Sequence, residues 1–137
     1  MDLAKEAKIS LIQPSLASGS TDPASASVDM SGYGSATFIG VTGAADVGAQ
    51  ASLQVQDSDD DSSFADIAGA VITSGFNPDD KLLVIEVKNP AKRYLRTVLT
   101  RSGTTNLAWA ATLAILHRGR VTPAVVDATH SVAPVSV

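Results

Sequence analysis

The sequence contains no cysteine, which excludes disulfide bonds, thiolate metal sites and a cysteine nucleophile. Aromatic residues are scarce at 4%, although hydrophobic residues make up 45% of the 137 residues. Much of this apolar content is alanine and valine, so the composition predicts a thin core of small side chains. Such a core suits two packed layers of β-sheet better than a large helical globule.

Positive charge is also in short supply, because the formal net charge is −4 and the isoelectric point is near 4.9. A nucleic-acid partner is therefore not expected, since phosphate neutralisation drives such binding. No apolar run approaches the roughly 18 residues of a membrane helix, and the longest, 107–116, has about half that length. No membrane partner is expected, and the charged start MDLAKEAKISLIQ predicts no secretory signal.

The clearest pattern in the chain is the alternation of apolar and polar residues over 49–56. Ala51, Leu53 and Val55 alternate with serine and glutamine, which predicts a strand with one buried face. The acidic stretch 57–63 must be a solvated turn, and the apolar signal resumes at 64–72. These three segments predict a β-hairpin.

Further strands are predicted along the chain, at 36–41, 82–87, 93–101 and 107–116. The run LLVIEV at 82–87 is nearly continuous in apolar residues, so a central strand covered on both faces is expected. Segment 107–116 favours helix by propensity, but its position after a strand and a short glycine loop favours a strand. Five or six closely spaced strands predict a single all-β domain, an antiparallel β-sandwich or jelly-roll-like fold over 28–120.

The N- and C-terminal segments differ in composition from residues 28–120. Residues 1–27 include a low-complexity stretch without the apolar mass to fold alone, so we expect an N-terminal arm that is disordered or orders on a partner. Residues 121–137 contain Pro123 and Pro134, which predicts an extended C-terminal tail. The apolar residues of the arm that are candidates for partner contact are Leu3, Ile9, Leu11 and Ile12.

The acidic turn resembles a calcium loop only at its start. Asp57, Asp59 and Asp61 have the spacing of the first three ligands. Ser62 stands where the loop needs glycine, and Ala68 stands where it needs a bidentate glutamate. We therefore predict no metal, and the turn is either a solvated hairpin loop or an acidic contact to a partner.

No catalytic arrangement is recognisable in the sequence. His117 and His130 are the only histidines, and neither has an acid or serine at a motif spacing. Ser102 lacks the flanking glycines of a nucleophile elbow, and Gly32 and Gly34 lack the third glycine of a phosphate loop. The sequence therefore predicts neither an enzyme nor a cofactor.

The residues Arg93, Tyr94 and Arg96 are candidates for a subunit interface. One interpretation is ordinary surface charge, with the arginine stems covering apolar edges. The alternative is a contact to the acidic turn of a neighbouring copy, because charge opposition favours it. Trp109 is expected in the core, unless it faces outward with Tyr94. The acidic partners in the second interpretation are Asp57, Asp59, Asp60 and Asp61.

Three blocks of the chain resemble a known protein family. They are residues 28–38, VDMSGYGSATF; residues 54–67, QVQDSDDDSSFADI; and residues 92–96, KRYLR. Together they are similar to segments of capsid cement (decoration) proteins of tailed bacteriophages. The chain departs from the family by having Asp61 and Ser62 where a turn glycine is usual, which leaves the geometry of that turn open.

The resemblance implies a small β-sandwich subunit that forms homotrimers on the outside of an icosahedral phage head. It implies the major capsid protein as partner, and a location on the virion surface after assembly in the host cytoplasm. The protein would bridge neighbouring capsomers and so stabilise the shell. One alternative is a tail or baseplate structural protein of the same phages. Another is a carbohydrate-binding module, although few aromatic residues are present for sugar stacking.

Overall fold

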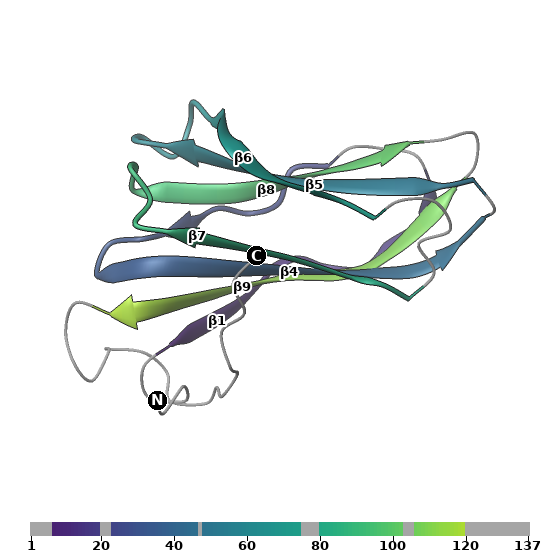
Figure 1. Ribbon diagram of the computed structural model, residues 1–137, viewed down its shortest axis with the longest axis horizontal. Helices are drawn as coiled ribbons and strands as arrows, with labels where there is room; N and C mark the ends of the chain where they lie inside the picture. Colours follow the sequence, from purple (N-terminus) through teal and green to yellow (C-terminus); the bar gives the residue numbers. More distant parts are fainter. Residues whose placement is uncertain (1–6, 20–22, 47, 75–79, 103–105, 120–137) are drawn as a thin grey trace.

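The computed structural model describes residues 7–19, 23–46, 48–74, 80–102 and 106–119. Over these residues the chain is all-β and forms two antiparallel sheets packed face to face (Figure 1). The predicted β-sandwich is therefore confirmed. The predicted tail 121–137 lies outside the described residues, as do Leu3 and His130.

The first layer, sheet A, has the strand order β1-β9-β4-β7, and β2 also pairs with β9. Every pairing in it is antiparallel. The long strands β4 and β9 lie at its centre, and β9 confirms the strand expected at 107–116. The strands are β1 (Lys8–Gln13), β2 (Leu16–Gly19), β4 (Tyr33–Ala45), β7 (Leu82–Lys88) and β9 (Leu107–Gly119).

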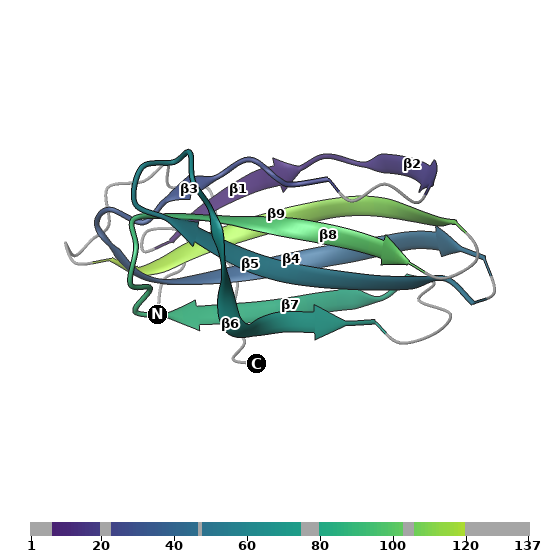
Figure 2. The ribbon, with the colours of Figure 1, turned by 90° about the horizontal axis from the view of Figure 1, so that it is seen from above.

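The second layer, sheet B, has the strand order β3-β8-β5-β6. The predicted hairpin around the acidic turn is confirmed, because β5 and β6 pair on either side of it. Figure 2 shows β6 leaving the plane of sheet B and running beside β7 of sheet A. The strands are β3 (Val28–Asp29), β5 (Gln50–Ser58), β6 (Ala65–Thr73) and β8 (Tyr94–Ser102).

The core lies between the sheets and follows the two-residue period. In β5, Ala51, Leu53 and Val55 are fully buried, as the alternation predicted. Trp109 of β9 is 1% exposed, which confirms its place in the core. Its Nε1 donates a hydrogen bond to Thr112 Oγ1 at 2.8 Å, so the one polar atom of the indole is satisfied.

Gly40 of β4 lies directly against Trp109. A Cβ at this position would be 2.5 Å from Cζ2 and 2.8 Å from Cη2 of the indole, closer than any real contact. We expect Gly40→Ala to lower the free energy of unfolding by about 1–3 kcal/mol, because overpacking a close-packed core forces side chains off their rotamers. Urea unfolding followed by fluorescence of this single tryptophan measures the effect.

Gly43→Ala is the matched control for that substitution. A Cβ at Gly43 would be 3.3 Å from the Ala108 Cβ, which a small shift accommodates. A loss at Gly43 as large as the loss at Gly40 would show that the indole contact is not the cause.

Two features of the fold differ from expectation. The strand β7 is the last strand of sheet A over the described residues, so its predicted central position is wrong. The predicted arm 1–27 is also corrected over 8–19, because β1 and β2 pair with β9 as part of sheet A. Backbone pairing to β9 holds these residues in the sheet, where the low-complexity composition had indicated an arm.

A bulge in β6 turns this strand toward sheet A. Gln56 pairs with Asp66 and Gln54 pairs with Val71, so β6 carries extra residues between these pairs. The side-chain Nε2 of Gln54 donates to the carbonyl oxygens of Ile67 and Ala70, at 3.0 and 3.1 Å. Gln54 thus satisfies carbonyl groups that the disrupted ladder leaves without a strand partner.

Candidate interaction surface

The face of sheet A that points away from the core is apolar, which is unusual for an antiparallel sandwich. Such a sheet commonly has one solvated, polar face. Toward one end of this face the residues that alternate with the core positions are aliphatic on four neighbouring strands, whereas Glu86 and Lys88 lie further along the same face of β7. Leu11 and Leu82 are 60% and 63% exposed, and the others are buried or half-buried. We call this surface the outer face of sheet A; it comprises Ile9, Leu11, Ile39, Val41, Leu82, Val84, Leu113 and Ile115.

A small second core lies on this face. Ile115 is 2% exposed and Ala7 is fully buried, and both pack with Ile9 and Ile39. These residues form a cluster separate from the core between the sheets. The segment around β1 therefore contributes apolar side chains to the outer face of sheet A.

One end of this face is polar but buried. Thr37 and His117 are 1% and 2% exposed, and Thr37 Oγ1 lies 3.0 Å from His117 Nε2. The fully buried Ser35 lies opposite His117 in the ladder between β4 and β9. The pair of Thr37 and His117 is a buried hydrogen-bonded contact that borders the apolar residues.

The outer face of sheet B has the opposite character. Its exposed and half-buried residues are mainly serine, threonine, glutamine and arginine, as a solvated sheet face requires. The outer faces of the two sheets therefore differ in the polarity of their side chains. The residues on the sheet B side are Gln50, Ser52, Gln54, Gln56, Tyr94, Arg96, Val98 and Thr100.

The acidic turn is held by its own carboxylate Asp60. Hydrogen bonds from the backbone N–H of Ser63, from Ser58 Oγ and from the backbone N–H of Ser62 reach Oδ1 at 2.9, 2.8 and 3.0 Å. They hold the pKa of Asp60 below its usual range. The turn is therefore built from local hydrogen bonds.

Asp61 takes the left-handed conformation that a glycine would adopt, with φ of 58°. This explains how the chain tolerates the missing turn glycine, since aspartate visits this region more readily than most residues. We expect Asp61→Val to lower the free energy of unfolding by about 1 kcal/mol, because a β-branched residue is strained there. Asp61→Gly is the control and should show no loss. Thermal unfolding measures both, and equal stability of the two variants would contradict this reading.

Each predicted interface cation has a contact within its own chain. Arg93 Nε and Nη2 donate to both carboxylate oxygens of Asp29, each at 2.9 Å, and the hydrogen bond from Arg93 lowers the pKa of Asp29. Arg96 Nε donates to Gln56 Oε1 at 2.9 Å, and its guanidinium lies 4.1 Å from the centre of the Phe64 ring. In the structure, these two arginines therefore contact residues other than the aspartates of the acidic turn.

The remaining predicted residues are placed as follows. Lys92 Nζ lies 3.8 Å from Asp57 Oδ1, so a lysine of the same chain contacts the first aspartate of the acidic turn. Asp59 is exposed, and Tyr94 is half-buried beneath the guanidinium of Arg93. A contact of these residues to a neighbouring copy stays a prediction.

The predicted arm residues are divided by the sheet. Ile12 is 5% exposed and belongs to the core between the sheets. Ile9 and Leu11 point to the other side and are part of the outer face of sheet A. The two-residue period of β1, which the low-complexity neighbourhood obscured, separates these roles.

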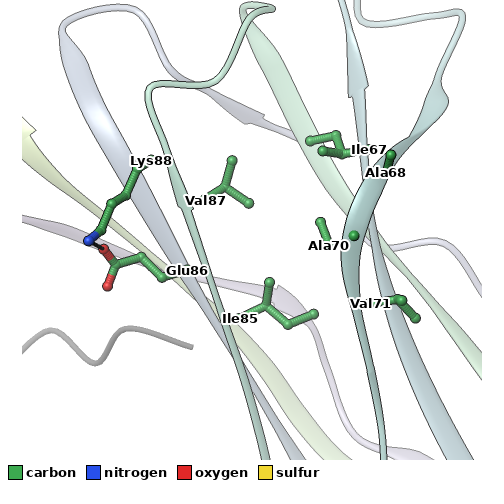
Figure 3. Close-up of a pocket in the computed structure, with 9 residues that line it drawn as sticks. Ile67, Ala68, Ala70, Val71, Ile85, Glu86, Val87 and Lys88 are labelled. Carbon is green, nitrogen blue, oxygen red and sulfur yellow. Dashed lines mark ion pairs between the residues drawn. The ribbon is translucent and has the colours of Figure 1, made fainter.

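A groove that the sequence did not predict separates β6 and β7. Its volume is about 330 Å³. Figure 3 shows Ile67 and Ala70 of β6 facing Ile85 and Val87 of β7 across it. Glu86 and Lys88 point away from the groove, and their ion pair is 3.7 Å long. The groove therefore lies at the side of the core where β6 of sheet B and β7 of sheet A separate.

Neither a metal site nor a membrane-spanning helix is found in the part of the chain that the structure describes. No group of three or more histidine, aspartate or glutamate side chains is placed there to hold a metal ion. No helix of those residues is long and apolar enough to cross a bilayer. What the described surface offers instead is apolar contact area.

No protein-family model matches the chain, and no curated protein gives a significant sequence match. Among solved structures, the chain is similar to the PBSX exported protein XepA, with a TM-score of 0.59 and 14% sequence identity. The similarity covers 100% of this chain and 44% of the XepA chain, so this chain spans less than half the length of that protein. At this identity the likeness shows a shared fold.

Proposed function

We propose that the protein is a structural protein of a tailed phage, which binds the outside of the assembled head as a cement (decoration) protein. Three sequence blocks resemble that family, and the fold is shared with the PBSX exported protein XepA. The observation that carries the proposal is the outer face of sheet A. It presents the exposed side chains of Leu11 and Leu82 beside half-buried aliphatic residues of the same sheet.

The exposed aliphatic side chains on this face favour a protein partner. Leu11 and Leu82 are more than half exposed. Fully burying a leucine side chain contributes about 1.5–3 kcal/mol, so covering this face would supply binding energy without any ordering of a flexible arm. Ile9 and Leu11 thus retain their predicted role in capsid contact, but they act from a strand of the sheet.

The mechanism is selective binding to one state of the shell. A protein that bridges neighbouring capsid subunits contacts a surface that exists only after assembly. It then stabilises the assembled state by the free energy of that binding. The major capsid protein is the partner, and the virion surface is the location.

Leu11→Lys tests which surface is used. Purified protein is mixed with expanded heads of the encoding phage that lack the protein, and occupancy is measured after sedimentation. We expect Leu11→Lys to weaken binding by roughly tenfold or more, because a buried charge replaces a leucine contact.

Val98→Lys is the matched control, since Val98 lies on the outer face of sheet B. Its occupancy should equal that of the wild type. Equal binding of Leu11→Lys and wild type would reject the outer face of sheet A as the contact. Loss of binding only in Val98→Lys would assign the contact to sheet B.

The alternative of a tail or baseplate protein is decided by position in the particle. Cryo-electron microscopy of the virion should show density for the protein on the head. Density confined to the tail would support the alternative and overturn the cement role.

A further inference from the structure

The guanidinium of Arg96 is held in one position on the outer face of sheet B. It lies 4.1 Å from the centre of the Phe64 ring, and its Nε donates to Gln56 Oε1 at 2.9 Å. The amide of Gln56 is fixed in turn, because its Nε2 donates to Asp66 Oδ1 at 2.8 Å. A flipped amide would put N–H groups against the guanidinium and an oxygen against the carboxylate. An aromatic ring and an oriented amide therefore fix the guanidinium.

The two terminal nitrogens of Arg96 have neither a hydrogen bond nor an ion pair within the described part of the chain. The other arginine side chains that the structure describes are engaged, Arg93 with both oxygens of Asp29 and Arg101 with backbone carbonyl groups. Two parallel N–H groups of a guanidinium match the two oxygens of a carboxylate. Because Arg96 is already oriented, little conformational entropy would be lost when a carboxylate binds.

The acidic turn carries carboxylates that suit this arginine. Asp59 and Asp61 are exposed, and neither has a hydrogen bond or ion pair to another described residue. The turn has a defined shape, because Asp60 accepts hydrogen bonds from within it. Figure 1 shows the loop between β5 and β6 on the outer side of sheet B, where Arg96 also lies.

We infer that Arg96 binds the acidic turn of a second copy of the chain, and that the two copies make this contact reciprocally. Arg96 pairs with Gln56, two residues before β5 ends at Ser58, so the arginine and the turn lie at the same end of sheet B. A twofold axis between the copies then places each Arg96 against the turn of the other. This inference does not rest on the proposed contact between sheet A and a phage head.

The other cations near the turn are less suited to the contact. Lys92 lies 3.8 Å from Asp57, and Arg93 is occupied by Asp29. The predicted subunit interface is thereby narrowed to Arg96. Exposed ion pairs are individually weak and are screened by salt, so we expect a weak association that depends on ionic strength.

Sedimentation equilibrium of the full chain measures this association. At roughly 1 mM protein, where weak complexes are populated, the wild type should have an average mass above that of the monomer at low salt. Raising NaCl to about 1 M shortens the screening length to about 3 Å and should restore the monomer. A wild type that is monomeric at low salt would overturn the inference, and so would an association that salt leaves unchanged.

Two charge reversals identify the groups in contact. Arg96→Glu and Asp59→Lys should each weaken association by roughly tenfold or more, because like charges then oppose each other between identical copies. Position 59 is chosen because Asp61 has a φ of 58°, where lysine would be strained. An equimolar mixture of the two variants should associate as the wild type does, since both contacts between unlike copies join opposite charges.

Asp46→Lys is the matched control. It makes the same change of charge on an exposed residue before β5, at the other end of the sandwich, and should associate as the wild type does. Circular dichroism establishes that each variant is folded. A mixture that associates no more than its two components alone would overturn the inference, as would an equal loss in Asp46→Lys and Asp59→Lys.

Discussion

Replacing Trp109 by alanine is expected to lower the free energy of unfolding by about 3–5 kcal/mol. Trp109 has the largest of the fully buried side chains, and it fills the space that Gly40 leaves in β4. Its removal would leave a cavity with no nearby side chain on Gly40 to close it. The hydrogen bond to Thr112 Oγ1 would also be lost.

Urea unfolding followed by circular dichroism measures this loss, because the variant has no tryptophan fluorescence. Trp109→Phe is the matched control and should lose less, since it keeps an aromatic ring in the cavity. A loss below about 1 kcal/mol for Trp109→Ala would mean that the sheets close on the cavity, which contradicts a rigid core.

Arg101→Met is expected to lower the free energy of unfolding by about 3 kcal/mol. Arg101 is only 6% exposed, and its Nη1 donates to the carbonyl oxygens of Ala17 at 2.9 Å and Leu107 at 2.8 Å. The guanidinium thereby ties β2 to β8 and β9 inside the molecule. Methionine would fill much of the volume but leave these carbonyls without their charged donor.

Amide hydrogen exchange separates this effect from general destabilisation. Residues 16–19 of β2 should lose protection before the centre of β4 does, because the lost contact is specific to β2. Arg96→Met is the control on the outer face of sheet B and should change stability by less than about 0.5 kcal/mol. Uniform loss of protection across both sheets would contradict the proposed role of Arg101.

Local patterns were sufficient to predict the sandwich and its hairpin. The alternation over 49–56 reports which face of β5 is buried, since the two-residue period is a local property. The strand at 107–116 was also predicted, against its helical propensity, from the short loop before it. These elements needed no knowledge of distant contacts.

The order of strands in the sheets could not be read in the same way. The run LLVIEV signals apolar surroundings, but whether these come from flanking strands or from a partner depends on long-range pairing. The contact of Arg93 with Asp29 joins residues 64 positions apart, which no local pattern reports. The outer face of sheet A was missed for the same reason, because it is assembled from four strands.

Binding of the purified wild type to phage heads in defined states tests the central claim most directly. Expanded heads lacking the protein, unexpanded proheads and free major capsid protein are each mixed with it and sedimented. Saturable binding to expanded heads alone is the predicted result, because only that state presents the bridged surface. Absence of binding to expanded heads, or equal binding to free capsid protein, would contradict the account.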